Sequence, residues 1–308
     1  MSLFNKITII GVGLIGSSLA RGIRRAGLAE TITIADKNEA YLARAEELDL
    51  ANNYTADTLM AVADADLVIL ATPLGQMGKV ATEMGAGLKQ GAIVTDVGSV
   101  KKSVLTALAP HIPDGVHVVP GHPVAGTEQS GPDAGYADLF KDRWAILTPS
   151  ETEDIAAVEA VKKFWEGLGS NVELMDAEHH DLVLAITSHV PHLIAYNIVG
   201  TASDLEAVTE NEVIKYSAGG FRDFTRIAAS DPTMWRDVFL NNKDAVLEML
   251  GRFSEDLTAL QRAIRWGDGD ALHDLFSHTR NIRRGIIDAG QDSDAVDFGR
   301  PHGEDDKD

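Results

Sequence analysis

The sequence predicts a doubly wound α/β domain followed by an all-helical domain. Short apolar, β-branched runs alternate with segments of helical length up to Met175, and the strand pattern stops there. The 308 residues also exceed the usual size of one hydrophobic core, so two domains are expected. We therefore assign residues 1–175 to the α/β domain, 176–290 to the helical domain and 291–308 to a tail.

Composition restricts the class of protein and its partners. With 44% hydrophobic and 24% charged residues the chain is ordinary for a globular protein, and its formal net charge of −20 disfavours binding to nucleic acid or anionic membranes. It contains no cysteine, which excludes disulfides, thiolate metal sites and cysteine nucleophiles. The sequence shows neither a signal peptide nor an uninterrupted apolar run of about 18 residues. We expect a cytoplasmic protein whose partners are small molecules and copies of itself.

A glycine motif near the amino terminus predicts a nucleotide-binding turn. The run KITIIGVGLIGSSLARGIRRAG, from Lys6, places Gly11, Gly13 and Gly16 in a GxGxxG pattern between an apolar run and a helical stretch. A second apolar run, TITIAD, ends at Asp36. In a dinucleotide-binding βαβ unit such glycines let a pyrophosphate approach the helix amino terminus, and the acid accepts hydrogen bonds from the adenosine ribose. The first domain is therefore expected to be a Rossmann dinucleotide-binding domain.

Asp36 also indicates which dinucleotide binds. Its carboxylate would repel a phosphate on the ribose, which favours NAD over NADP, although the neighbouring Lys37 carries the opposite charge. A glycine-rich turn without any ligand is the alternative. We expect NAD to contact Gly11, Gly13, Leu14, Ile15, Gly16, Asp36 and Thr72.

The remaining elements of the α/β domain follow from the same alternation. Five further strands are expected in the runs ADLVILATP (65–73), GAIVTDVGS (91–99), VHVVPGHP (116–123), WAILTP (144–149) and NVELM (171–175). Helices are expected at 75–88, 101–109 and 154–169.

The second domain is helical in pattern. Asp176 is a suitable N-cap for the stretch that follows it, and Pro191 falls inside that stretch, so the helix should kink or restart beside His189. A later helix should begin with Asp231 as N-cap and Pro232 as its first residue.

An apolar seam follows, and it could bury against its own domain or against a second subunit. From Val246 onward its apolar residues are spaced alternately four and three positions apart, and Phe239 precedes them. The seam consists of Phe239, Val246, Leu250, Phe253, Leu257, Leu260 and Ile264. We favour a homodimer through the helical domain. One more apolar helix is expected from Leu272, Leu275, Phe276, Ile282 and Ile286, before a polar tail, Asp288 to Asp308, that should be largely disordered.

Two turns should place candidate catalytic residues at the sheet edge where ligands bind. In a doubly wound sheet this is the edge at the carboxyl ends of the strands, where both the Asp96–Ser99 turn and the Gly121–Gly126 loop are expected. His122, within GHPVAGTEQSG, has the ordinary pKa of a general base near neutrality. A loop histidine satisfied by the backbone is the alternative.

Two segments of the helical domain could complete the site. His189 and His192 lie three residues apart; a metal would need a third ligand, and His179 and His180 lie two to three turns earlier, so we expect no metal and assign His189 to a polar pocket wall. The segment GGFRDFTRIAASDPTMWRD (219–237) combines glycines, arginines and a tryptophan, which is typical of an anion receptor because arginine pairs a carboxylate in two places. Solvated surface arginines are the alternative.

Together these runs resemble the prephenate and arogenate dehydrogenase family. The resemblance rests on DVGSVK (96–101), GHPVAGTEQSG (121–131), SHVPH (188–192) and GGFRDFTRIAASDPTMW (219–235), in this order, and covers nearly the whole chain from GVGLIGSS onward. It implies an NAD(P)-binding Rossmann domain, a helical dimerisation domain, and oxidative decarboxylation of prephenate, arogenate or both in tyrosine biosynthesis. Nothing in the sequence separates the two substrates.

The resemblance also implies residue roles. His122 would accept the proton of the substrate hydroxyl, with Ser99 hydrogen-bonding near that hydroxyl and the histidine. His189 would position the substrate and Arg226 would hold a carboxylate. Five further substrate contacts are implied: Trp235, Gly219, Gly220, Thr127 and Glu128. Thr127 and Glu128 fall in a segment that the family associates with substrate choice and with the response to tyrosine.

Other functions fit the sequence less well. UDP-sugar dehydrogenases of similar build need a catalytic cysteine, and this chain has none. Hydroxyacid dehydrogenases related to 6-phosphogluconate dehydrogenase usually carry a helical catalytic lysine, whereas Lys215 is the only lysine between Met175 and Asn241. A non-catalytic NAD-binding regulator on the same fold would be expected to have lost His122 or Arg226.

Overall fold

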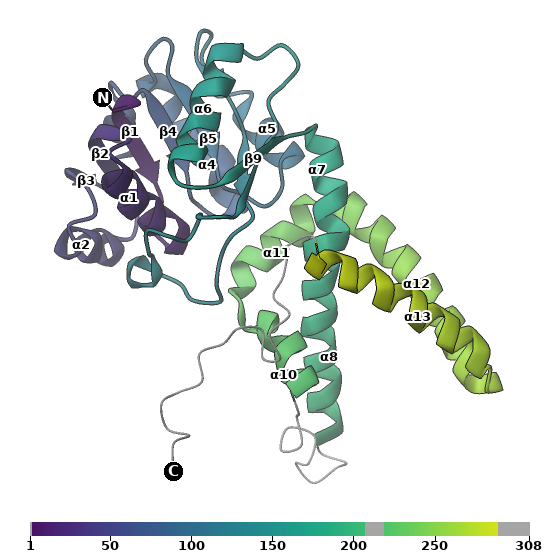
Figure 1. Ribbon diagram of the computed structural model, residues 1–308. Helices are drawn as coiled ribbons and strands as arrows, with labels where there is room; N and C mark the ends of the chain where they lie inside the picture. The colour runs from purple at the N-terminus through teal and green to yellow at the C-terminus, as the bar shows by residue number, and fades with distance from the viewer. Residues whose placement is uncertain (1, 207–218, 289–308) are drawn as a thin grey trace. The chain divides into compact units, whose positions relative to one another are not determined.

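The computed structural model describes residues 2–206 and 219–288 (Figure 1). The chain divides into two compact units, one up to Met249 and one from Leu250 onward. The predicted tail after Asp288, and Lys215, lie outside the described residues.

The first unit contains a six-stranded parallel sheet of order β3-β2-β1-β4-β5-β6. Its strands are β1 (Phe4–Ile10), β2 (Ala29–Ala35), β3 (Asn53–Thr55), β4 (Leu67–Leu70), β5 (Ile93–Asp96) and β6 (His117–Val118). The helices between them are α1 (Leu14–Ala26), α2 (Glu39–Glu47), α3 (Thr58–Val62), α4 (Met77–Met84) and α5 (Lys102–Leu108). This strand order is that of a Rossmann fold, with the switch point between β1 and β4. The predicted fold class is confirmed.

Helices cover both faces of this sheet because its strands are apolar on both sides. Ile7 and Ile9 of β1 lie in one core cluster with α1 and with α6 (Ile155–Gly167), whereas Ile10 lies in a second cluster with α3, α4 and α5. Buried side chains on both faces are the usual pattern of a parallel sheet. The predicted helices therefore pack where a doubly wound fold requires them.

One predicted strand is wrong as a single element. The run 116–123 forms two strands in different sheets, because the chain leaves the parallel sheet at Val118 and re-pairs from Gly121. There β7 (Gly121–Pro123) pairs antiparallel with β8 (Trp144–Leu147), which pairs parallel with β9 (Asn171–Leu174). His122 therefore lies in a short strand and not in a loop, opposite Ile146.

The helical part of the first unit begins as predicted. The Asp176 side chain caps α7 (Ala177–Leu184) by accepting from the backbone N–H groups of Glu178 and His179. A π-helical segment, Ala185–His189, then interrupts the α-helix before α8 (Val190–Glu206). The predicted irregularity before Pro191 is thus present, since a proline at this position cannot supply the N–H that a regular helix needs.

Ala177–Leu205 is also long and apolar enough, by length and composition alone, to cross a membrane. The stretch contains no uninterrupted apolar run of such length, because polar residues such as Ser188 and His189 lie within it, and it was not predicted from the sequence. Core helices of soluble proteins satisfy the same criterion, so the finding is weak support for a membrane span.

The remaining helices follow α8 after the undescribed gap. They are α10 (Gly219–Thr225), α11 (Pro232–Asn241), α12 (Lys243–Trp266) and α13 (Gly269–Asp288). Asp231 caps α11 with Pro232 as its first residue, as predicted. In the second unit, Gly267 follows the last residue of α12, and its positive φ of 68° allows the chain to turn into α13.

Candidate active site

The expected cofactor residues lie at the carboxyl edge of the parallel sheet. Gly11 follows β1, Asp36 follows β2, and Thr72 lies two residues beyond β4. At Gly11, φ is 100° and an added Cβ would lie 2.5 Å from the carbonyl oxygen of Ala71, so only glycine fits where β1 and β4 diverge. The turn is thus built at the switch point of the sheet.

The other two glycines shape the space in front of α1. A Cβ on Gly16 would overlap the Gly11 carbonyl, so this glycine permits close packing of helix and turn. Gly13 is the N-cap of α1, and an added Cβ there would meet nothing within 4 Å. Open space at the amino end of a helix of 13 residues fits a pyrophosphate, which the free N–H groups and the helix dipole would stabilise.

Asp36 is held in position by the same turn. Its Oδ2 accepts from the Val12 N–H at 2.9 Å and its Oδ1 from the Asn38 N–H at 2.8 Å. Lys37, whose charge argued against NAD, donates instead to Glu83 at 2.8 Å. The Asp36 side chain, with its neighbouring lysine paired elsewhere, fits a free ribose hydroxyl better than a phosphate.

A buried ion pair supports the strand that carries His122. Lys101 and Asp96 are in direct contact, and the Lys101 ammonium also donates to the Gly121 carbonyl at 2.5 Å. Asp96 accepts in addition from the N–H groups of Gly98 and Gly121 at 2.7 and 3.2 Å. Burial lowers the pKa of Lys101 and raises that of Asp96, and their mutual attraction opposes both changes. The pair thus connects the end of β5 to β7.

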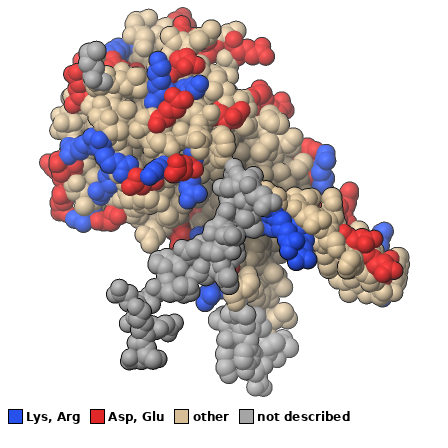
Figure 2. Space-filling model, in the orientation of Figure 1, with Lys and Arg blue, Asp and Glu red and all other residues tan. Residues whose placement is uncertain are grey.

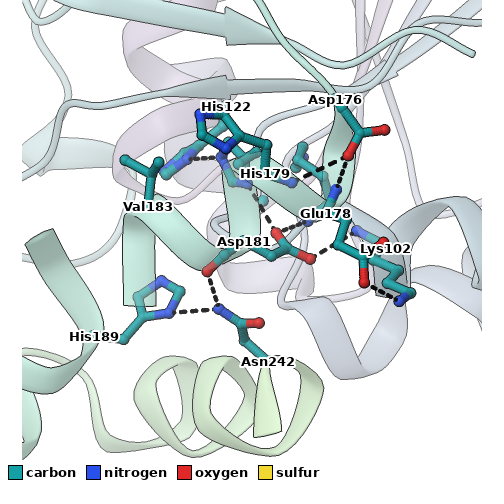
Figure 3. Close-up of polar contacts among 12 residues, drawn as sticks. Lys102, His122, Asp176, Glu178, His179, Asp181, Val183, His189 and Asn242 are labelled. Carbon is teal, nitrogen blue, oxygen red and sulfur yellow. Dashed lines mark hydrogen bonds and ion pairs between the residues drawn. The ribbon is translucent and has the colours of Figure 1, made fainter. Parts of the chain in front are cut away.

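His122 belongs to a chain of three polar side chains (Figure 3). Its Nδ1 lies 2.9 Å from Nε2 of His180, and Nδ1 of His180 lies 2.8 Å from Oδ1 of Asp181. Burial, followed by the nearby His180, Lys101 and His189, holds the pKa of His122 well below its ordinary value. His122 is therefore neutral near pH 7, which is the form that can accept a proton.

His189 lies at the end of the π-helical segment Ala185–His189, in the same unit as His122. Its Nδ1 lies 3.1 Å from the side-chain nitrogen of Asn242, whereas its buried Nε2 has no hydrogen-bond partner among the described residues. Burial lowers the pKa of His189 to about 4, against the opposing effects of Asp181 and of the Ser99 backbone. The Ser99 hydroxyl makes no hydrogen bond to His122 or to any other described residue. The backbone of Ser99 therefore lies beside His189, whereas the hydrogen-bond partner of His122 Nδ1 is His180.

Trp235 and Arg226 flank these histidines differently. The Trp235 ring is buried and stacks on His192 with ring centroids 3.7 Å apart, and it meets His189 edge-on at 6.1 Å. Arg226 is half-exposed, and its Nη1 lies 3.2 Å from Oε2 of Glu128. The guanidinium is thus paired with a carboxylate that an anionic ligand would have to replace or join.

The other residues expected to contact the substrate lie in exposed or loop positions. Gly219 and Gly220 begin α10, are exposed, and an added Cβ would have free space at Gly220. The Thr127 hydroxyl accepts from the Gln129 N–H at 3.2 Å within the β7–β8 connection.

Several residues that the fold brings to His122 and His189 were not predicted as site residues from the sequence. Lys101 was quoted only as part of DVGSVK, His180 was considered only as a metal ligand, and Asp181 and Asn242 were not singled out. No local signal could have found Asn242, since 53 residues separate it from His189.

These features define a nicotinamide-dependent dehydrogenase: a Rossmann sheet with a glycine turn and a ribose acid, beside a buried neutral histidine. The family described as "Prephenate dehydrogenase, nucleotide-binding domain" matches residues 19–174, and "Prephenate dehydrogenase, dimerization domain" matches residues 176–278. The chain belongs to the prephenate dehydrogenase family, as the resemblance predicted.

Individual relatives agree with this assignment. The chain is 45% identical to a cyclohexadienyl dehydrogenase of Zymomonas mobilis, covering 92% of this chain and 96% of the relative. It is 32% identical to a prephenate dehydrogenase of Bacillus subtilis, over 91% and 76% of the two chains. Among solved structures, a prephenate dehydrogenase from A. aeolicus in complex with hydroxyphenyl propionate and NAD+ has a TM-score of 0.83 at 34% identity, over 92% and 98% of the chains.

Proposed function

We propose that this protein catalyses the NAD-dependent oxidative decarboxylation of prephenate, arogenate or both, in tyrosine biosynthesis. The observation that carries the proposal is His122, a buried neutral imidazole with Nδ1 engaged by His180 and no described partner for Nε2. The names of the relatives, which include prephenate and cyclohexadienyl dehydrogenases, support this substrate class.

The chemistry needs few groups from the protein. Bound NAD supplies the acceptor for the hydride that leaves ring carbon C4. His122 takes the proton of the hydroxyl on that carbon, so that its oxygen can form a carbonyl as the hydride departs. Aromatisation drives the loss of carbon dioxide, so the protein has only to align the ring, remove the proton and hold the substrate.

We assign the remaining roles by position. His189 and Ser99 hold the substrate hydroxyl near His122, and Arg226 binds a carboxylate after exchanging its contact with Glu128. Trp235 lines the same site, with Gly219, Gly220 and Thr127 at its periphery. The glycine turn with Leu14 and Ile15 binds the pyrophosphate of NAD, Asp36 its ribose, and Thr72 lies beside the turn.

We further propose the domain arrangement given above, with residues 1–175 binding the nucleotide and 176–290 binding substrate and forming a homodimer. Large apolar side chains on α8, α12 and α13 are exposed in the single chain, which supports a second subunit as their partner. We place the enzyme in the cytoplasm, because its cofactor and proposed substrates are small water-soluble molecules.

The test is an assay of the purified protein with NAD and, separately, prephenate and arogenate. We expect NADH to form with at least one substrate, and the ratio of the two kcat/KM values identifies the preferred one. Identification of the product as 4-hydroxyphenylpyruvate or tyrosine establishes the decarboxylation. No turnover with either substrate, using NAD and then NADP, would contradict the proposal and favour a binding protein on this fold.

A further inference from the structure

Asp181 contacts both histidines of the site through intermediaries. Its carboxylate accepts from the backbone N–H groups of Lys101 and Lys102, at 2.8 and 3.0 Å, and lies 2.8 Å from Nδ1 of His180. Its backbone carbonyl accepts from the side-chain nitrogen of Asn242 at 2.8 Å. Figure 3 shows Asp181 between His122 on one side and Asn242 with His189 on the other.

The carboxylate of Asp181 determines where His180 and His122 carry their protons. A carboxylate that already receives two backbone N–H groups only accepts, so His180 must donate from Nδ1. Burial lowers the pKa of His180, and the neutral ring then presents a lone pair at Nε2. Nδ1 of His122 donates to that lone pair, which leaves the lone pair of His122 on Nε2.

Asn242 imposes the opposite arrangement on His189. The amide must point its nitrogen toward the Asp181 carbonyl, because a reversed amide would set two oxygens against each other. The same nitrogen lies 3.1 Å from Nδ1 of His189, so this ring atom accepts and the proton resides on Nε2. That Nε2–H is buried and has no hydrogen-bond partner among the described residues, although the Ser99 backbone lies near enough to raise the pKa of the ring; a ligand can therefore engage it as an acceptor.

We propose that Asp181, acting through His180 and Asn242, holds His122 and His189 in opposite tautomers, one presenting an acceptor and the other a donor to the substrate. The inference rests on the proposed function and assigns three positioning residues to it. A hydroxyl needs both partners: Nε2 of His122 takes its proton, while Nε2–H of His189 donates to its oxygen as this becomes a carbonyl.

The direct test reads the tautomers by nuclear magnetic resonance of the full chain with NAD bound and histidine ring nitrogens labelled with 15N. His122→Asn and His189→Asn variants assign the two rings. We expect His122 to be protonated at Nδ1 and His189 at Nε2. A proton on Nε2 of His122, or on Nδ1 of His189, would overturn the inference. The spectrum is independent of turnover, so an inactive parent enzyme would refute the proposed function separately.

Substitutions of His180 test whether the tautomer of His122 affects the reaction. His180→Leu removes the acceptor for His122, and we expect kcat to fall by about a hundredfold or more, the range for an impaired general base, with NAD affinity unchanged. His180→Gln places an amide oxygen near the lost Nε2 and should restore part of kcat and the Nδ1–H form of His122. His179→Leu, on the exposed neighbour, is the matched control and should leave kcat unchanged. Equal kcat losses for Leu and Gln would contradict a role in setting the tautomer.

The Asn242→Asp substitution tests the tautomer proposed for His189. The substituted carboxylate has nearly the same shape but accepts a proton where the amide donates, so His189 should move its proton to Nδ1. We expect a larger loss of kcat from Asn242→Asp than from Asn242→Ala, which leaves the ring without a preference. The reverse order, with both variants folded and binding NAD, would overturn the assignment for His189.

Discussion

At the scale of single residues, the site depends on burial that keeps histidines neutral. His122 and His189 both have lowered pKa values, and desolvation is the first cause for each. A hydrogen-bond partner at a ring nitrogen lowers the cost of burying a neutral imidazole, and His180 and Asn242 each supply one, at Nδ1 of His122 and of His189.

Replacing the proposed base should abolish most activity without loss of the cofactor. We expect His122→Asn to lower kcat by about two to four orders of magnitude, because the substitution removes the group proposed to take the proton. Steady-state kinetics measures this loss, and NADH fluorescence titration should give nearly the parent affinity. Parent-like turnover would remove His122 from the mechanism.

Arg226→Ala should act on substrate binding first. Loss of a charge-assisted contact to a carboxylate should raise KM by about ten- to a hundredfold, with a smaller change in kcat. Arg222→Ala, one turn earlier on α10 and exposed, is the matched control. Overlapping saturation curves for the Arg226 variant and the parent would refute the assigned role.

At the scale of elements, the α7–α8 segment carries the polar core of the site. It contributes His180, Asp181 and His189, and its π-helical turn ends at His189. Such interruptions of a helix are frequent at functional sites, since they change the direction in which side chains leave the helix. The segment therefore combines a structural irregularity with buried titratable groups.

Those groups should make the protein sensitive to mild acid. Burial lowers the pKa values of His180 and His189, the latter to about 4, so between about 6.5 and these lower values the unfolded chain binds more protons than the folded one. Stability should be highest above about pH 6.5 and fall as pH decreases, by at most about 1.4 kcal/mol per pH unit for each histidine.

Denaturant unfolding between pH 7 and about pH 5 measures this slope before most carboxylates titrate. The His189→Gln variant should show a smaller slope than the parent, and His179→Gln, on the exposed neighbour, an unchanged one. A free energy of unfolding that is flat across this range would show that the buried histidines do not control acid stability.

At the scale of the whole molecule, charge is distributed in pairs of opposite sign. Figure 2 shows basic and acidic side chains side by side on the visible face. The arginine–aspartate pairs include Arg24 with Asp49, Arg25 with Asp138 and Arg44 with Asp133. Such pairs contribute little stability at an exposed surface. They also leave the strongly negative net charge uncompensated, in agreement with small-molecule partners.

The proposed dimer predicts which exposed apolar residues matter. Ile264 on α12 and Phe276 on α13 are 67% and 56% exposed in the single chain. We expect the double substitution Ile264→Glu and Phe276→Glu to convert a particle of twice the chain mass into one of 33.0 kDa, measured by light scattering after gel filtration. Ile155→Glu, on the nucleotide-binding side and 79% exposed, should leave the mass unchanged. A parent protein that is already monomeric would contradict the proposal.

The sequence by itself determined the elements whose signals are local. The glycine turn, the acid after β2, the caps at Asp176 and Asp231 and the break before Pro191 each depend on the backbone requirements of a few consecutive residues, and the structure contains all of them. The run 116–123 was misassigned as one strand because two sheets share it, and pairing partners are not local.

Only the tertiary structure decided how the site is held. His122, His180 and Asn242 lie far apart in sequence, and their contacts arise where β7, α7 and the end of α11 meet. Which ring nitrogen carries a proton depends on the partner at hydrogen-bond distance, and no pattern of residue types along a chain encodes such distances. Sequence therefore indicated that His122 is the candidate base, whereas the fold determined which of its nitrogens is free to act.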